Sequence, residues 1–72
     1  MRAAEVIRIM ARNAGIGHRQ LSRDLGKADT YIGATLSRGS DVKVETLAAI
    51  ARQCGYRLIV EDEVQGRRYQ VG

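Results

Sequence analysis

Residues 15–39 constrain the fold of this chain more than any other segment, because they are typical of two short helices joined at a glycine. Leu21 and Leu25 lie four residues apart and share one face of the first helix. Ser22 is small enough for another helix to cross closely over it. Gly26 follows where the chain needs a left-handed turn residue, which glycine adopts without steric cost. The segment therefore predicts two helices held at a sharp angle.

Hydrophobic spacing and turn residues predict four helices along the chain. They cover about residues 2–13, 18–25, 29–37 and 44–53. The predicted inward faces are Ala3, Val6, Ile9 and Met10 in the first helix, Ile32 and Leu36 in the third, and Val44, Leu47, Ile50 and Ala51 in the fourth. Gly55 is the stop signal of the fourth helix, and residues 38–41 are rich in residues that break helices.

After Gly55 the chain changes to strand-forming residues, which predicts strands at about residues 56–62 and 67–71. A two-residue turn at Gln65 and Gly66 would pair Val60 with Val71, Asp62 with Tyr69, and Glu63 with Arg68. The alternative is a frayed tail after Val60. The predicted fold class is therefore mainly α, with four helices and a C-terminal β-hairpin or strand.

Length and composition limit the chain to one small domain. A chain of 72 residues buries only about 60% of the surface that its unfolded form exposes, and dimerisation is the most economical source of further burial. Cys54 is the single cysteine, so we expect no disulfide and no zinc site, and a reducing, cytoplasmic location. No apolar run reaches the roughly 18 residues of a membrane-spanning helix. The net charge of +4 permits binding to a polyanion.

Several segments match one family pattern over residues 6–56. The matching residues are Leu21, Ser22, Leu25 and Gly26, then Tyr31 and Ile32, then Glu45, Thr46, Leu47, Ile50 and Ala51, and finally Gly55 and Tyr56. This pattern resembles the Cro/CI-type (XRE) helix-turn-helix family, the lambda-repressor-like DNA-binding domains. The resemblance implies a DNA-binding domain over residues 1–55, followed by a β extension over residues 56–72.

Four positions depart from that pattern. Lys27 and Thr35 stand where apolar residues are usual, and Lys27 is expected to lay its stem over the core. Val42 and Lys43 stand where the family commonly has a proline and a helix-capping serine. Asp41 is therefore expected to cap the fourth helix instead.

The resemblance makes residues 29–37 the recognition helix, whose N-terminal half lies in the major groove. The expected contacts to bases or the groove are Ala28, Asp29, Thr30, Tyr31, Gly33 and Ala34. The expected phosphate contacts are His18, Arg19, Arg23, Lys27, Arg38 and Lys43. The expected dimer contacts are Tyr56, Leu58, Val60, Tyr69 and Val71.

Two of these residues have a second interpretation. Asp29 either accepts from a cytosine amino group or caps its helix, and the cap is the preferred interpretation. Tyr31 either contacts a phosphate or packs its ring on the second helix. Gly33 and Ala34 offer no hydrogen bonds, but they allow the helix backbone to approach the bases closely. DNA shape is then expected to contribute to specificity.

The leading expectation is a small Cro-like repressor that binds duplex DNA as a homodimer. A second is the antitoxin of a toxin–antitoxin pair, in which the C-terminal segment binds a toxin protein. A third is a helix-turn-helix fold that no longer binds DNA. His18 and Cys54 lie on different elements and lack a third, orienting group, so no enzyme, cofactor, metal or membrane partner is expected.

Overall fold

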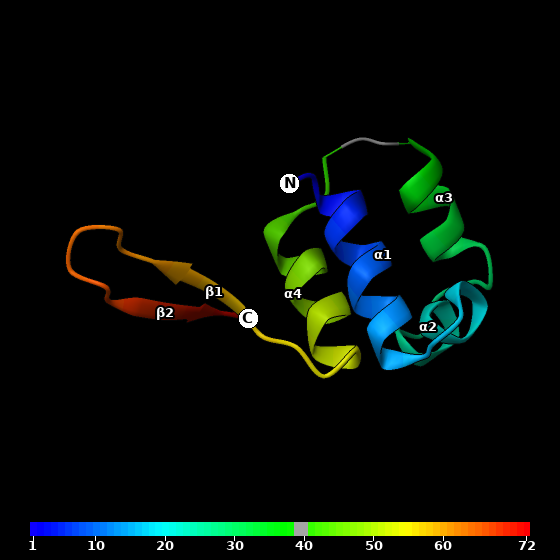
Figure 1. The fold of residues 1–72 in the computed structure, drawn as a ribbon. Coiled ribbons are helices and arrows are strands. Elements are labelled where there is room, and N and C mark those ends of the chain that lie inside the picture. The colour runs from blue at the N-terminus through cyan, green and yellow to red at the C-terminus, as the bar shows by residue number, and fades with distance from the viewer. Residues whose placement is uncertain (39–40) are drawn as a thin grey trace.

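The computed structural model describes residues 1–38 and 41–72, and shows four helices followed by a two-stranded antiparallel sheet (Figure 1). The elements are α1 (Ala3–Ala14), α2 (His18–Asp24), α3 (Tyr31–Arg38), α4 (Val44–Gln53), β1 (Leu58–Glu61) and β2 (Arg68–Val71). The prediction of a mainly helical chain with a C-terminal hairpin is therefore confirmed, and the frayed tail is not formed. The hairpin projects from one end of the helices (Figure 1). Within the described ranges, no helix combines the length and apolar character needed to cross a membrane.

One large aliphatic side chain from each helix meets in the core. Ile7 of α1, Leu21 of α2, Ile32 of α3 and Ile50 of α4 are each completely buried. Full burial of one such side chain stabilises the fold by about 1.5–3 kcal/mol. The four helices therefore share a single core, although α2 and α3 are each too short to be stable alone.

The buried face of α1 differs from the predicted one. Ile7, Met10 and Ala11 are buried, so the prediction was right for Met10 and missed the other two. The remaining predicted residues of α1 are only half-buried: Ala3, Val6 and Ile9. The physical reason is that apolar residues cover a wide arc of this helix, so their spacing alone does not determine which part of the arc is buried. The buried part is determined by packing against the other helices.

The start of α4 also differs from prediction. Lys43 precedes the helix in an extended conformation, with no side-chain capping bond, so Asp41 is not the cap. Val44 was predicted to face inward but is 51% exposed, and Leu47, one turn later, is the first residue of α4 that packs against the core. The other predicted inward residues of α4 are buried or half-buried: Leu47, Ile50 and Ala51. The turn predicted at residues 38–41 lies partly outside the described residues.

The hairpin register is shifted by two residues from the predicted one. The observed pairs are Leu58 with Val71, Ile59 with Gln70, Val60 with Tyr69, and Glu61 with Arg68. Asp62 causes the shift, because its Oδ1 accepts from the amides of Val64 (2.8 Å) and Gln65 (3.2 Å), while its own amide donates to the Arg67 carbonyl (2.7 Å). These bonds build a longer loop than a two-residue turn. A shift of two keeps each side chain on its face of the sheet.

Candidate nucleic-acid interface

Ser22 joins the two helices of the candidate interface. Its side chain is fully buried, and its Oγ donates to the His18 carbonyl (2.8 Å) and accepts from the Ile32 amide (3.0 Å). The Ile32 amide lies in the first turn of α3, where backbone donors have no partner within the helix. A serine in α2 therefore completes the start of α3 and fixes the position of one helix on the other.

The turn after α2 is closed by its own backbone. Gly26 has φ +73°, as predicted, and its amide donates to the Arg23 carbonyl at 2.8 Å. The next amide, that of Lys27, donates to the Ser22 carbonyl at 3.0 Å. This pair of bonds is a Schellman motif, which ends a helix at a left-handed residue. Backbone hydrogen bonds therefore hold the turn, and it does not require side-chain contacts around it.

Two of the predicted DNA contacts bind each other. Arg23 donates from Nε and Nη2 to the two carboxylate oxygens of Asp29, at 2.9 and 3.0 Å. Hydrogen bonding to Arg23 lowers the pKa of Asp29 below its ordinary value. Helix α3 begins at Tyr31 and not at residue 29, so Asp29 lies two residues before the helix. The predicted helix cap at Asp29 is therefore wrong, since the carboxylate ties α2 to the turn before α3.

Tyr31 is half-buried and packs against the core. The Lys27 Nζ lies 5.6 Å from the centroid of its ring, within the range of a cation–π contact. Thr35, at a usually apolar position, is buried, and its hydroxyl donates to the Tyr31 carbonyl at 2.8 Å. The departures at Lys27 and Thr35 are thus accommodated without an unsatisfied buried side-chain polar atom among the described residues.

A shallow hollow of about 160 Å³ brings three of the predicted contacts together. Tyr31, Arg38 and Lys43 line it, together with Thr46 of α4, Thr35, Val42 and the acidic residue Asp41. Arg38 comes from the last turn of α3, and Lys43 comes from the residue before α4. Thr46 was not predicted as a site residue, and the hollow brings it together with residues of α3. Arginine, lysine, threonine and tyrosine side chains are all common donors to phosphate oxygens.

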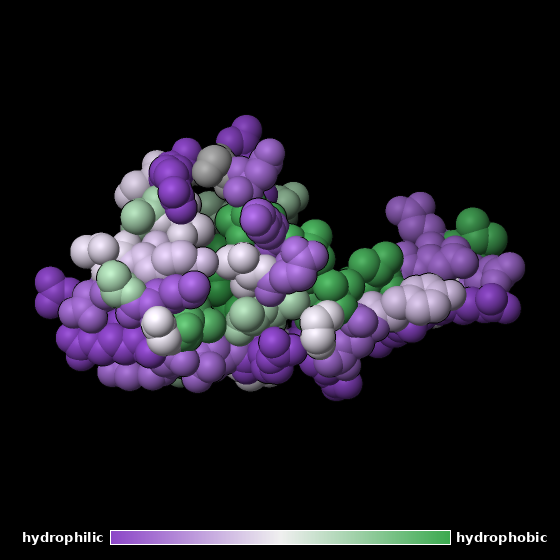
Figure 2. Space-filling model, turned by 180° about the vertical axis from the view of Figure 1, so that it is seen from behind, coloured by the Kyte–Doolittle hydropathy of each residue, from purple (hydrophilic) through white to green (hydrophobic). Residues whose placement is uncertain are grey.

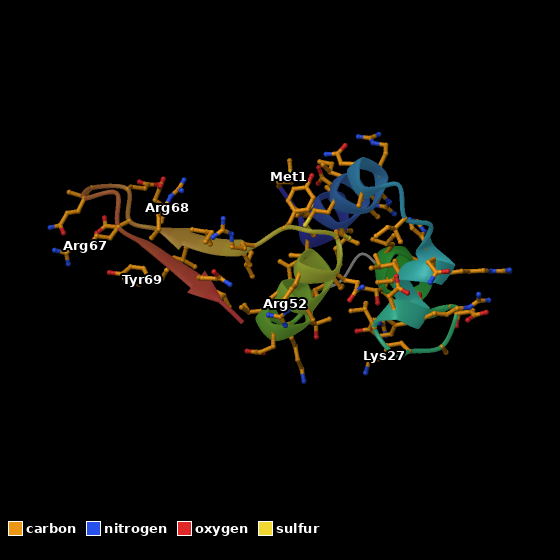
Figure 3. All side chains as sticks on the ribbon, turned by 90° about the horizontal axis from the view of Figure 1, so that it is seen from below. Met1, Lys27, Arg52, Arg67, Arg68 and Tyr69 are labelled. Carbon is orange, nitrogen blue, oxygen red and sulfur yellow. The ribbon has the colours of Figure 1, made fainter. Side chains whose placement is uncertain are left out.

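The other predicted contacts are accessible. The exposed ones are His18, Arg19, Ala28, Thr30 and Ala34, and Gly33 is half-buried. Lys27 lies at the α2–α3 end of the molecule, whereas Arg67 and Arg68 lie at the opposite end, on the hairpin (Figure 3). The charged side chains of the α2–α3 unit therefore form a group separate from those of the hairpin.

Of the five predicted dimer contacts, four belong to the hairpin and one lies between α4 and β1. Leu58, Val60, Tyr69 and Val71 lie on β1 and β2. Tyr56 precedes β1, and its hydroxyl accepts from the Asn13 side-chain amide at 3.1 Å, which ties it to α1.

The chain was compared with protein-family models, with curated proteins and with solved structures. None of the three comparisons gives a match.

Proposed function

We propose that this protein is a sequence-specific regulator that binds duplex DNA with a lambda-repressor-like helix-turn-helix unit. In this proposal α2 and α3 form the unit, and the N-terminal half of α3 lies in the major groove. The buried bond from the Ile32 amide to Ser22 supports it, because a groove-reading helix must be held rigidly by its neighbour.

Gly33 is the observation that carries the proposal. It lies inside α3, its φ is not positive, and a Cβ added there would meet no atom within 4 Å. Neither backbone conformation nor internal packing therefore requires a glycine. Glycine inside a helix costs about 0.5–1 kcal/mol relative to alanine. A ligand that approaches the helix backbone closely would explain why a glycine occupies position 33.

The charges around α3 agree with a polyanionic ligand. Lys27, Arg38 and Lys43 are exposed, and none of them makes an ion pair among the described residues. Arg38 and Lys43 line one hollow with Tyr31 and with the acidic residue Asp41. Cations grouped beside a helix with a bare, small-residue surface fit phosphates flanking a groove.

Selection of binding sites from a random duplex DNA pool tests the proposal, followed by fluorescence anisotropy of the enriched duplex at several salt concentrations. We expect an enriched sequence, and a logarithmic salt slope that falls by about 0.9 when Arg38→Ala or Lys43→Ala removes one phosphate contact. Arg67→Ala, which removes one charge from the distant hairpin, is the matched control and should leave the slope unchanged. No enrichment, or equal effects of all three variants, would contradict the proposal.

A second candidate function is the antitoxin role, and the projecting hairpin favours it. The hairpin exposes apolar residues that a protein partner would cover, among them Val60 and Tyr69 at 58% each. An antitoxin forms a tight complex with the product of a neighbouring gene, so co-expression and co-purification with that product would distinguish this role.

A further inference from the structure

The apolar residues of α1 extend beyond the part of the helix that the core uses. Ile7 and Met10 are buried in the core, whereas Val6 and Ile9 are only half-buried. Val6 and Ile9 both line a hollow of about 250 Å³ on the surface of the molecule. The part of the apolar arc that the core leaves uncovered therefore forms one wall of this hollow.

The hollow, which we call the base groove, lies where the helices meet the hairpin. Leu47 of α4 and Leu58 of β1 line it together with Val6 and Ile9 of α1, and all four side chains are half-buried. Figure 2 shows hydrophobic surface that runs from the helices onto the hairpin. Concave sites with apolar walls and a few polar groups are typical of small-molecule binding sites, which measure about 300–1,000 Å³ for drug-sized ligands. The base groove therefore fits a ligand smaller than these.

Tyr56 and Arg57 are the polar residues that line the base groove. Backbone bonds at the end of α4 fix the chain just before them. The Gly55 amide donates to the Arg52 carbonyl at 3.1 Å, and the Tyr56 amide donates to the Ala51 carbonyl at 2.8 Å. The polar end of the groove is thus held by α4 and does not depend on the strands of the hairpin.

These two residues suit an anionic group of a ligand. Arg57 is exposed and makes no ion pair among the described residues. It also borders a second hollow, beside Arg68, which places it at the rim of the base groove. The Tyr56 hydroxyl accepts from the Asn13 side-chain amide at 3.1 Å, and a phenol that accepts one bond still has its proton to donate. A guanidinium and a phenol match the two oxygens and the single charge of a carboxylate.

We propose that the base groove binds a small amphipathic carboxylic acid with a hydrocarbon chain of medium length. The hydrocarbon chain lies against Val6, Ile9 and Leu47, and Arg57 and Tyr56 hold the carboxylate at the rim. A phosphate carries close to two negative charges, whereas Arg57 is the one charged side chain among the described residues that line the groove. A bound acid contacts α1, α4 and the start of β1, so it links the helices to the hairpin.

Titration of octanoate into the isotope-labelled chain, followed by NMR, tests the proposal without DNA and therefore independently of the proposed function. We expect saturable shifts of the Ile9 and Leu47 amide resonances, with a Kd below about 1 mM, and no shifts at Ser22 or Thr30. Hexanoate should bind about 15-fold more weakly, because each methylene removed from water changes Kd by about fourfold. Equal affinity for the two acids, or shifts confined to α2 and α3, would overturn the proposal.

Arg57→Ala tests the assignment of the charged end of the ligand. The variant should bind octanoate about tenfold more weakly, because a hydrogen bond between charged groups is lost. Its affinity for octanol, which has the same hydrocarbon chain and no charge, should not change. Arg67→Ala is the matched control at the far end of the hairpin (Figure 3) and should leave both affinities unchanged. An equal loss of octanol and octanoate binding would show that Arg57 acts through the fold, and the assignment would be wrong.

Val6→Glu tests the assignment of the apolar end. A carboxylate inside the base groove should repel octanoate and weaken its binding at least tenfold, while circular dichroism shows the helices intact. Ala14→Glu makes the same change in charge at an exposed position of α1 and should leave binding unchanged. If a second copy of the chain covers the groove instead, octanoate shifts no resonance and the chain sediments as a dimer, which would overturn the proposal.

Discussion

The Ser22 hydroxyl in α2 accepts a hydrogen bond from the Ile32 amide in α3, with 3.0 Å between Oγ and N. Both residues are completely buried, so water cannot replace this bond. The same hydroxyl donates to the His18 carbonyl, which leaves Oγ with a partner for its proton and one for a lone pair. One small side chain thus serves both helices of the candidate interface.

Replacing Ser22 with alanine should destabilise the fold. Ser22→Ala leaves the Ile32 amide buried without an acceptor, which costs about 1–3 kcal/mol. Urea denaturation followed by circular dichroism measures the change. Ser37→Ala, at an exposed serine on α3, is the control and should change stability by less than about 0.5 kcal/mol. Equal stability of the two variants would mean that the Ser22 bond does not contribute.

Replacing Gly26 with valine should also destabilise the fold, for a different reason. A Cβ at this position meets open space, so no clash with neighbours is involved. The cost comes from φ +73°, which an L-residue adopts at about 1–2 kcal/mol and a β-branched one at more. The midpoint of urea unfolding should therefore fall. An unchanged midpoint would show that the turn relaxes to another conformation.

Replacing Gly33 with alanine should raise the stability of the fold and lower its affinity for DNA. The change should stabilise α3 by about 0.5–1 kcal/mol, because the new Cβ meets no neighbour and the helix backbone loses less entropy. Affinity for the selected duplex should nevertheless fall by tenfold or more, which corresponds to about 1.4 kcal/mol. Urea denaturation and anisotropy on the same sample measure the two effects. Unchanged affinity would remove the main support for close approach at α3.

The Arg23–Asp29 ion pair should make stability depend on pH only in acid. The pKa of Asp29 is lower in the folded chain than its ordinary value, so the unfolded chain binds the proton more readily. The stabilisation is complete above the unfolded pKa, near about 4, and is lost as pH falls through the folded pKa. Asp29→Asn should lower the urea midpoint slightly at neutral pH and not at the acid end. Glu63→Gln, in the hairpin loop, serves as the control, and a pH-independent difference for Asp29→Asn would contradict the assignment.

Sequence patterns predicted the parts of this fold that depend on local chemistry. The left-handed conformation at Gly26 follows from the properties of glycine, and the burial of Leu21 and Ile32 follows from helical spacing. The arc of α1 that faces the core was not predictable in this way, since Ile7 and Val6 are equally apolar neighbours. Their difference in burial depends on where the other helices pack.

The candidate site was predictable as a set of residues but not as a set of contacts. Arg23 and Asp29 are six residues apart, and only the geometry of the turn brings their side chains together. The sequence predicted that the small side chain of Ser22 lets another helix cross closely over it. Its hydrogen bond to the Ile32 amide was not predictable, because that bond depends on how α2 and α3 are placed relative to each other. The hairpin loop likewise depended on the side chain of Asp62, which spacing does not reveal.

The hairpin is attached to the rest of the molecule chiefly through α4. A segment held by so few neighbours opens with a smaller free energy than the core does, and it opens without unfolding the helices. Amide protons of β1 and β2 should therefore exchange with solvent through this local opening, at rates that respond weakly to mutations in the helical core. The amide protons of Ile7 and Ile50 should exchange only when all four helices unfold. The chain is thus expected to contain two cooperative units of unequal stability within 72 residues.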